Sequence, residues 1–263
     1  TNKNENADNL LLIFMIKKET LDNFLGGKLK IYQLKKGFRA GHDSVLLASA
    51  IKAKDGDCCL ELGFGTGVVS LCLAKRIPNL DIIGIENDRE MLKISKKNIK
   101  FNNFKKNIKV FAGDIEGKIE NYQFIERHSF DQIYANPPYF IEERLSEPAN
   151  KNKRIANIGN KKTLDLWLKK ALTFSKSGGT ITFINHIQNL PEMLTLFSKK
   201  LGDIKFTPIF PKKDKKASRF IISGVRDSKK PLTYNQGLIL TNKDGKIPKK
   251  IDRLLRNGIG FND

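Results

Sequence analysis

The sequence has few of the side chains that hold transition metals. Its 263 residues include three cysteines and three histidines. Cys58 and Cys59 are adjacent, so they face opposite sides of an extended strand, and no cysteine or histidine has zinc or iron spacing. We therefore expect no metal site and no disulfide framework, which suits a protein of the reducing cytoplasm.

Long apolar runs are also missing. No stretch reaches the roughly 18 apolar residues that a membrane-spanning helix needs, so we predict no membrane contact. The short apolar run 10–16 follows a polar start with no basic segment and no small-residue cleavage site, which argues against a signal peptide. We expect residues 1–19 to be disordered or an extension.

Acidic residues are outnumbered. There are 48 Lys and Arg against 28 Asp and Glu, which gives a net charge of +20. Such a surplus favours a polyanion, and we expect the partner to be RNA and the protein to be a monomer. The candidate phosphate contacts are the basic residues of two clusters: Lys151, Lys153, Arg154, Lys212, Lys213, Lys215, Lys216 and Arg219.

Strand and helix patterns alternate along most of the chain, which predicts one doubly wound α/β domain. The expected sheet is Rossmann-like, mostly parallel and seven-stranded, and ends in an antiparallel hairpin. The expected strands are 57–62, 81–85, 108–111, 130–135, 180–184, 204–210 and 218–225. We assign 57–230 to this domain, 20–56 to a small N-terminal hairpin and helix that cover the ligand, and 231–263 to a tail packed on the same domain.

Three local expectations are less regular. Residues 20–25 are predicted to form a brief helical turn capped by Thr20. Residues 141–162 show many charges and little periodicity, which predicts a mobile basic loop. Gly178 and Gly179 are expected to break the chain before strand 180–184.

A glycine-rich turn follows the first strand of the domain. Glu61 precedes Gly63, Gly65 and Gly67, and a helix is predicted from Val68. Glycines let the backbone approach a ligand closely, and a helix N-terminus favours a carboxylate or another anion. The chain has no G-x-x-x-x-G-K-[ST] pattern, which excludes a P-loop ATPase.

Polar residues end four successive strands. Glu61 stands near the end of the first, Glu86 ends the second, Asp114 follows the third and Asn136 follows the fourth. Strand ends of a parallel sheet meet at one crevice, so we expect these side chains to surround one ligand. Glu86 lies about 20 residues beyond the glycines, where a carboxylate binds ribose hydroxyls.

The reaction is expected to take place at the motif Asn136-Pro137-Pro138-Tyr139. Proline cannot continue a central strand, so a rigid extended platform follows the strand. The Asn136 amide and the Pro137 carbonyl offer two acceptors, and Tyr139 offers an aromatic face. This set fits an exocyclic amino group on a flat ring, although the motif alone is equally consistent with a proline-rich turn.

The ordered motifs resemble those of class I S-adenosylmethionine-dependent methyltransferases. Asn136 to Tyr139 matches the [DNS]-P-P-[YFW] motif of enzymes that methylate planar amino nitrogens. More closely, the chain is similar to the bacterial tRNA1(Val) adenine-37 N6-methyltransferases. The similar stretches are 37–48, the Gly63–Gly67 turn, 136–140 and 238–245, within a resemblance that spans roughly 20–258.

The resemblance implies roles for particular residues. Glu61 would belong to the cofactor site, Glu86 would hold the ribose, and Asp114 would hold the adenine amino group of S-adenosylmethionine. Asn136, which also borders the cofactor, would hold the target base together with Pro137 and Tyr139. The remaining cofactor contacts would be Phe38, Arg39, Gly41, Gly63, Gly65 and Gly67. Two positions depart from the family: Glu61, where Asp is commoner, and Phe64, where a small or polar residue is commoner.

Two other functions remain open from the sequence. Protein glutamine N5-methyltransferases use the same Asn-Pro-Pro-Tyr platform, but usually carry a helical N-terminal domain for which little room exists before Gly37. A non-catalytic RNA-binding module is a further alternative, against which the complete glycine turn and platform argue.

Overall fold

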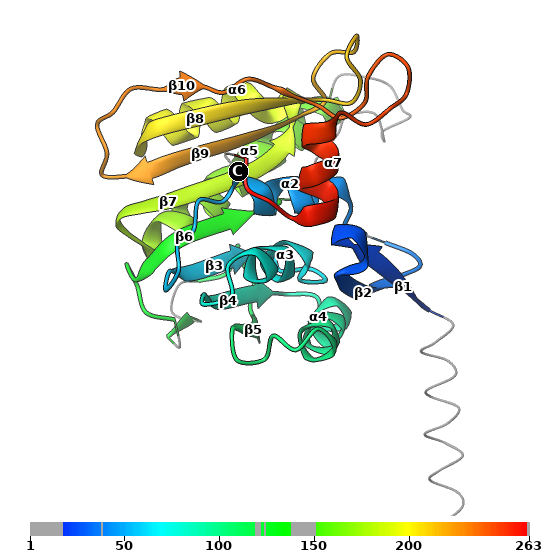
Figure 1. Cartoon of the computed structure of the whole chain (residues 1–263). Helices are drawn as coiled ribbons and strands as arrows, with labels where there is room; N and C mark the ends of the chain where they lie inside the picture. Colours follow the sequence, from blue (N-terminus) through cyan, green and yellow to red (C-terminus); the bar gives the residue numbers. More distant parts are fainter. Residues whose placement is uncertain (1–17, 38, 119–121, 124, 138–150, 262–263) are drawn as a thin grey trace, which may run out of the picture.

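A computed structural model describes residues 18–37, 39–118, 122–123, 125–137 and 151–261, with 151–161 described as backbone (Figure 1). One sheet organises this part of the chain. Its strands follow the order β10-β8-β9-β7-β6-β3-β4-β5, and β11 also pairs with β8. The seven longer strands are β3 (Cys58–Leu62), β4 (Asp81–Glu86), β5 (Ile108–Ala112), β6 (Phe130–Ala135), β7 (Ser175–His186), β8 (Leu201–Phe210) and β9 (Arg219–Arg226).

The centre of the sheet is parallel. Strand β3 pairs with β4 on one side and with β6 on the other, and the strand order reverses there. Leu60, Leu62 and Cys59 of β3 are fully buried because helices cover both faces. A reversal of strand order at the carboxyl ends is where open α/β sheets place their ligands.

Each face of the sheet packs against its own helices. Residues of α2 (His42–Ala50), α3 (Val68–Arg76), α4 (Arg89–Phe101) and α7 (Lys249–Asn257) belong to one apolar cluster, and residues of α5 (Lys151–Phe174) and α6 (Leu190–Ser198) to the other. In Figure 1, α5 and α6 lie behind the sheet and α2, α3 and α7 in front. The doubly wound α/β fold is therefore confirmed.

The antiparallel end of the sheet also agrees with the prediction. Strand β9 pairs antiparallel with both β7 and β8, and so lies between them. Two further strands of two residues each, β10 (Thr233–Tyr234) and β11 (Leu238–Ile239), pair with β8 in parallel. No helix in the described part of the chain is long and apolar enough to cross a membrane.

The predicted helical turn at 20–25 is wrong. Glu19–Phe24 is strand β1, which pairs antiparallel with β2 (Leu29–Leu34). The chain reverses in a short 3-10 turn, Leu25–Gly27, where Leu25 and both glycines have positive φ. Pairing with β2 satisfies the backbone along the whole segment, which a single isolated helical turn could not do.

Two further predictions need correction. Helix α5 begins at Lys151, so residues 151–162 are helical and only 141–150 lie outside the described residues. Strand β7 runs through the glycine pair as an irregularity: Ser175 pairs with Phe130 and Thr180 with Gln132. A Cβ on Gly179 would lie 2.8 Å from the Phe130 carbonyl oxygen, so glycine permits this bulge instead of ending the strand.

Phe64, one of the two departures from the family pattern, is a core residue. Its ring is 2% exposed and packs beneath the glycine turn, against the faces of Gly67 and Gly84. A Cβ on Gly67 would lie 2.6 Å from the ring, and one on Gly84 of β4 would overlap it. Phe64 therefore fits into the turn because Gly84 on the neighbouring strand has no side chain.

This packing predicts the effect of a single methyl group. Gly84→Ala should destabilise the protein by about 1–3 kcal/mol, because the added Cβ cannot share the space of the Phe64 ring. Chemical denaturation of the variant measures the loss. The Gly84→Ala, Phe64→Leu double variant should lose less than the sum of the two single variants, and simple additivity would contradict the contact.

Candidate active site

The register of the central strands brings three of the four predicted polar residues to one edge, together with Gly63. Leu62 is paired with Ile85 on one side and with Ala135 on the other, and Glu86 is paired with Ala112. The residues that follow these pairs therefore lie along the same carboxyl edge. They are Gly63, Glu86, Asp114 and Asn136.

The glycine turn lies at the centre of this edge. Gly63, Gly65 and Gly67 all have positive φ, between 54° and 84°, a backbone conformation that residues with a side chain rarely adopt. The Phe64 N–H donates to the Ile85 carbonyl at 2.9 Å, which ties the turn to β4. Gly67 precedes α3 without a side-chain cap, so the start of this helix suits an anionic ligand group.

Glu86 closes the crevice from the side of β4. Its Oε2 accepts the Gly65 N–H at 2.6 Å and its Oε1 accepts the Asp88 N–H at 2.8 Å. The side chain is 7% exposed, and each oxygen has a further lone pair. Two fixed acceptors fit a pair of adjacent ribose hydroxyls.

Glu61 lies inside the fold, 2% exposed. Its Oε2 accepts the Ser70 hydroxyl at 2.5 Å and the Ser70 N–H at 3.2 Å, and the Ser70 hydroxyl also contacts the Tyr134 hydroxyl at 2.8 Å. Burial raises the pKa of Glu61 to about 8, and the two bonds from Ser70 offset part of that rise. Glu61 therefore anchors the first turn of α3 beneath the glycines.

The raised pKa predicts how stability depends on pH. Because the folded pKa lies above the ordinary value of 4.5, protonated Glu61 stabilises the fold below about pH 4.5, and this contribution is lost as pH rises toward 8. Glu61→Gln, which cannot ionise, should gain stability relative to the native protein between about pH 5 and pH 8. Denaturation across this range measures the difference; exposed Glu116→Gln is the control, and a constant difference would contradict the assignment.

Asp114 follows β5 at the open side of the edge. Its Oδ1 accepts the Glu116 N–H at 3.0 Å, its backbone carbonyl accepts the Tyr122 hydroxyl, and the side chain is exposed. The local turn thus fixes a carboxylate beside the crevice, next to Glu86 at the end of the neighbouring strand β4. Such a carboxylate can accept from an exocyclic amino group of a ligand.

Asn136 and Pro137 follow β6 directly beside the glycine turn. Since Leu62 pairs with Ala135, Asn136 is the neighbour of Gly63 across the sheet. Asn136 is half-buried and Pro137 is buried. Pro138, Tyr139 and Phe38 lie outside the described residues, so their predicted roles remain predictions.

The segment before α2 is held by the N-terminal hairpin. The Ala40 N–H donates to the side-chain oxygen of Gln33 at 2.8 Å, and Gln33 Nε2 donates to Asp22 at 2.6 Å. The Arg39 guanidinium pairs with Asp22 and donates to the Leu34 carbonyl. Arg39, a predicted cofactor contact, therefore has a structural partner, and Gly41 forms the N-cap of α2.

Asn98 is a site-building residue that sequence reasoning missed. This fully buried α4 side chain accepts the Tyr32 N–H at 2.7 Å and donates to the carbonyls of Tyr32 and Thr66, at 3.0 and 2.9 Å. It thereby joins the hairpin to the glycine turn. Its partners lie 66 and 32 residues away, so no local pattern could reveal it.

Trp167, the only tryptophan, packs under the turn from α5. A Cβ on Gly63 would lie 2.6 Å from its indole Cη2, so Gly63 is required here by both space and φ. The residue is 8% exposed, and its Nε1 has no hydrogen-bond partner in the described structure. A natural fluorophore therefore touches the turn.

Cofactor binding should consequently change the emission of Trp167. Titration with S-adenosylhomocysteine should give a saturable change in intensity or wavelength, because the ligand and the indole contact the same turn. Gly63→Ala should displace the indole and weaken binding by at least about tenfold, since its φ of 71° is strained for alanine. Emission that stays constant at ligand concentrations that raise the Tm would contradict this placement.

The predicted basic residues fall in different environments. Lys213, Lys215 and Lys216 are exposed in the turn between β8 and β9, with Lys212 half-buried. Arg219 differs, because its Nε donates to Asp43 of α2 at 3.0 Å and one of its terminal nitrogens donates to the Ser218 carbonyl. Lys151, Lys153 and Arg154 belong to the first turn of α5.

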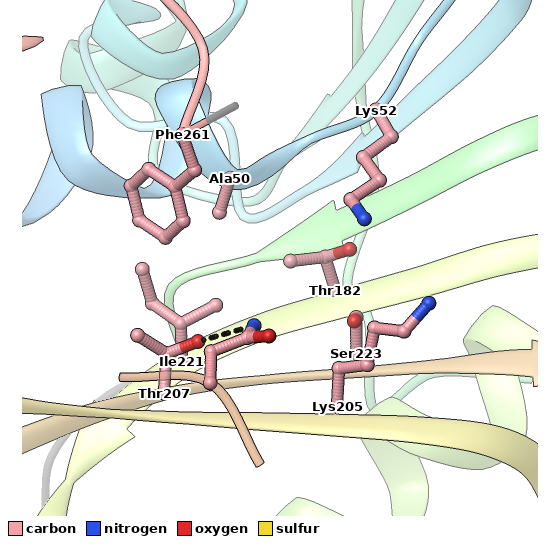
Figure 2. A pocket seen from close by; sticks show the side chains of 9 residues that line it. Ala50, Lys52, Thr182, Lys205, Thr207, Ile221, Ser223 and Phe261 are labelled. Carbon is pink, nitrogen blue, oxygen red and sulfur yellow. Dashed lines mark hydrogen bonds between the residues drawn. The ribbon is translucent and has the colours of Figure 1, made fainter. Parts of the chain in front are cut away.

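A separate hollow lies on the α2 side of the sheet (Figure 2). Lys52 and Lys205 lie on the same side of it in Figure 2, and Asn235 donates to the Thr207 hydroxyl at 3.0 Å. It contains none of the predicted site residues. Its lining comprises Ala50, Lys52, Thr182, Lys205, Thr207, Ile221, Ser223, Asn235 and Phe261.

Known proteins resemble this chain in both sequence and fold. A family model described as methyltransferase small domain matches residues 39–156, which include the glycine turn, Glu86, Asp114 and Asn136. The structure of a predicted O-methyltransferase from Agrobacterium tumefaciens superposes with a TM-score of 0.68 at 20% identity, over 83% of this chain and 97% of that one. M. jannaschii TYW2 in complex with AdoMet superposes with a TM-score of 0.53 at 15% identity, over 79% and 85% of the two chains.

The match over residues 39–156 identifies a methyltransferase small domain in this part of the chain, and the two solved structures share its fold. Among curated proteins, a tRNA1(Val) (adenine(37)-N6)-methyltransferase of Bacteroides thetaiotaomicron is 30% identical over 155 residues, 59% of this chain and 62% of that protein. One of Histophilus somni (strain 129Pt) is 29% identical over 195 residues, 73% of this chain and 78% of that protein.

Proposed function

We propose that the protein transfers the methyl group of S-adenosylmethionine to the N6 amino group of an adenine in tRNA, within the anticodon loop. The observation that carries this proposal is the adjacency of Asn136 to Gly63 across β6 and β3. It sets an amide and a proline carbonyl beside the turn of the cofactor site. The two reactants would therefore meet at the same strand ends.

The crevice has groups suited to each part of the cofactor. Glu86 would accept the ribose hydroxyls and Asp114 the adenine amino group, while the uncapped start of α3 would face the methionine carboxylate. The Thr66 hydroxyl is buried in the turn without a hydrogen-bond partner in the described structure, so it could form one further hydrogen bond to the cofactor. The bound cofactor supplies an electrophilic sulfonium methyl group.

The role of the Asn136 platform follows from the electronics of adenine. The amino nitrogen is a poor nucleophile, because its lone pair is delocalised into the ring. The side-chain oxygen of Asn136 and the backbone carbonyl of Pro137 would accept its two hydrogens and favour a tetrahedral nitrogen. Tyr139 would stack on the base, a contact worth roughly 1–3 kcal/mol.

The choice of tRNA rests on three supports. The curated relatives are named tRNA1(Val) (adenine(37)-N6)-methyltransferases, and the aligned part covers 62% of one and 78% of another. The net charge of +20 suits a phosphate backbone. An adenine in an RNA loop is already unpaired, so it enters the crevice at lower cost than a duplex base.

Substitution of Asn136 tests the reaction. Asn136→Ala should lower methyl transfer at least about 100-fold, with affinity for S-adenosylhomocysteine changed less than about threefold. Asn136→Asp, which keeps an acceptor, should retain more activity than Asn136→Ala. The assay uses labelled S-adenosylmethionine with total tRNA from a strain lacking this protein, followed by nucleoside analysis.

N6-methyladenosine is the expected product of that assay. Full activity of Asn136→Ala would contradict the proposal, as would a different methylated nucleoside. Label that enters protein while the tRNA stays unlabelled would favour the glutamine N5-methyltransferase alternative. Thermal denaturation of each variant checks that the fold is intact.

A further inference from the structure

Two basic turns far apart in sequence form one surface. The first is the turn 211–217 between β8 and β9, and the second is 241–250, which leads into α7; together we name them the two-turn surface. The Lys213 N–H donates to the Thr241 carbonyl at 3.0 Å, and the Leu240 N–H donates to the Phe210 carbonyl at 2.9 Å. Backbone bonds thus hold the two turns side by side, as Figure 1 shows at the start of α7.

The surface carries a large excess of positive charge. It contains eight lysines against two acidic residues, Asp214 and Asp244, which pair with Lys243 at 3.2 Å and Lys246 at 3.7 Å. Seven of the lysines are exposed and Lys212 is half-buried. The lysines are Lys212, Lys213, Lys215, Lys216, Lys243, Lys246, Lys249 and Lys250.

The surface lies on the same edge of the sheet as the crevice. Strand β8 enters the first turn from its carboxyl end at Phe210, and Arg219, where β9 starts, is paired with His186 at the carboxyl end of β7. Arg219 also binds Asp43 in the first turn of α2, and α2 packs against α3, the helix that follows the glycine turn. A continuous edge therefore joins the lysines to Asn136.

Lys249 and Lys250 oppose the stability of their own helix. They occupy the first turn of α7, which has no side-chain cap, and cations at a helix N-terminus are unfavourable; Asp252 in the same turn offsets only part of their charge. The buried residues of α7, Ile251 and Leu254, pack against the fold and supply its anchorage. An external anion at these two exposed lysines would therefore be favourable.

We propose that the two-turn surface binds the phosphate backbone of the RNA whose base enters the crevice. This inference rests on the proposed function and extends its footprint to 241–250. RNA fits better than a membrane, because Ile251 and Leu254 of α7 are buried and a single large apolar side chain of the two-turn surface, Ile247, is exposed. The rigid pairing of the turns presents the ammonium groups to a regularly spaced polyanion.

A matched pair of variants tests the surface. The test variant replaces Lys243, Lys246, Lys249 and Lys250 with Gln. The control replaces Lys54, Lys105, Lys106 and Lys109 with Gln, which removes the same charge from exposed positions at the opposite, amino edge of the sheet. Affinity for unmodified tRNA is measured without cofactor over a range of salt concentrations.

The test variant should bind tRNA about 10–100-fold more weakly at moderate salt, with a slope of log affinity against log salt smaller by about 2–3. The control should change the slope by less than about 1. Lys249→Gln with Lys250→Gln should also raise the Tm by about 1–4 °C, so weaker binding cannot be ascribed to unfolding. Equal losses in the test and control variants would overturn the surface.

Methyl transfer and tRNA binding are measured separately, so the proposed function and the proposed surface can fail independently. If methyl transfer to tRNA fails but the native protein binds tRNA through these lysines, the proposed function is wrong and the surface stands. If methyl transfer occurs and the test variant binds and reacts like the control, the surface is wrong and the function stands. A third result would also overturn the proposed surface. In it, the native protein binds anionic lipid vesicles and not tRNA, and the test variant no longer binds the vesicles.

Discussion

The parallel register of β3 between β4 and β6 is the constraint on which the site depends. It places Gly63, Glu86 and Asn136, which are far apart in sequence, on one edge. A shift of one residue in β6 would turn Asn136 to the other face and move it away from the glycine turn. Apolar burial on both faces of β3 holds this register, so the packing of Leu60 and Leu62 also fixes the geometry of the crevice.

Much of the sheet and crevice could be predicted because their signals are local. Buried strands, the glycines that follow one of them and the prolines that follow another each occupy a few adjacent residues. Strand β1 was missed because its pairing with β2 outweighs the helical signals of 20–25. The start of α5 was missed because basic residues mask its period, while its later half packs Leu168 and Phe174 in the core.

The residues that support the site could not be found locally. Asn98 joins Tyr32 to Thr66, Gln33 fixes the backbone of Ala40, and Arg219 reaches Asp43 across 176 positions. Each is an ordinary polar residue in sequence, and only the tertiary structure supplies its partner. Arg219 shows the consequence: its charge suggested a phosphate contact, which remains a prediction, and only the structure reveals that it also links β9 to α2.

The charges of the crevice explain why the proposed RNA substrate would need a second contact region. Glu86 and Asp114 place carboxylates at the strand ends, and these suit the hydroxyls and amino group of a nucleoside but repel phosphates. An unpaired base, which is neutral, can enter this edge while its backbone stays outside. Screening limits attraction to roughly 8–10 Å, so the phosphates must be held by lysines close to the same edge. The proposed two-turn surface would meet this requirement, because its lysines attract the phosphates that the carboxylates of the crevice repel.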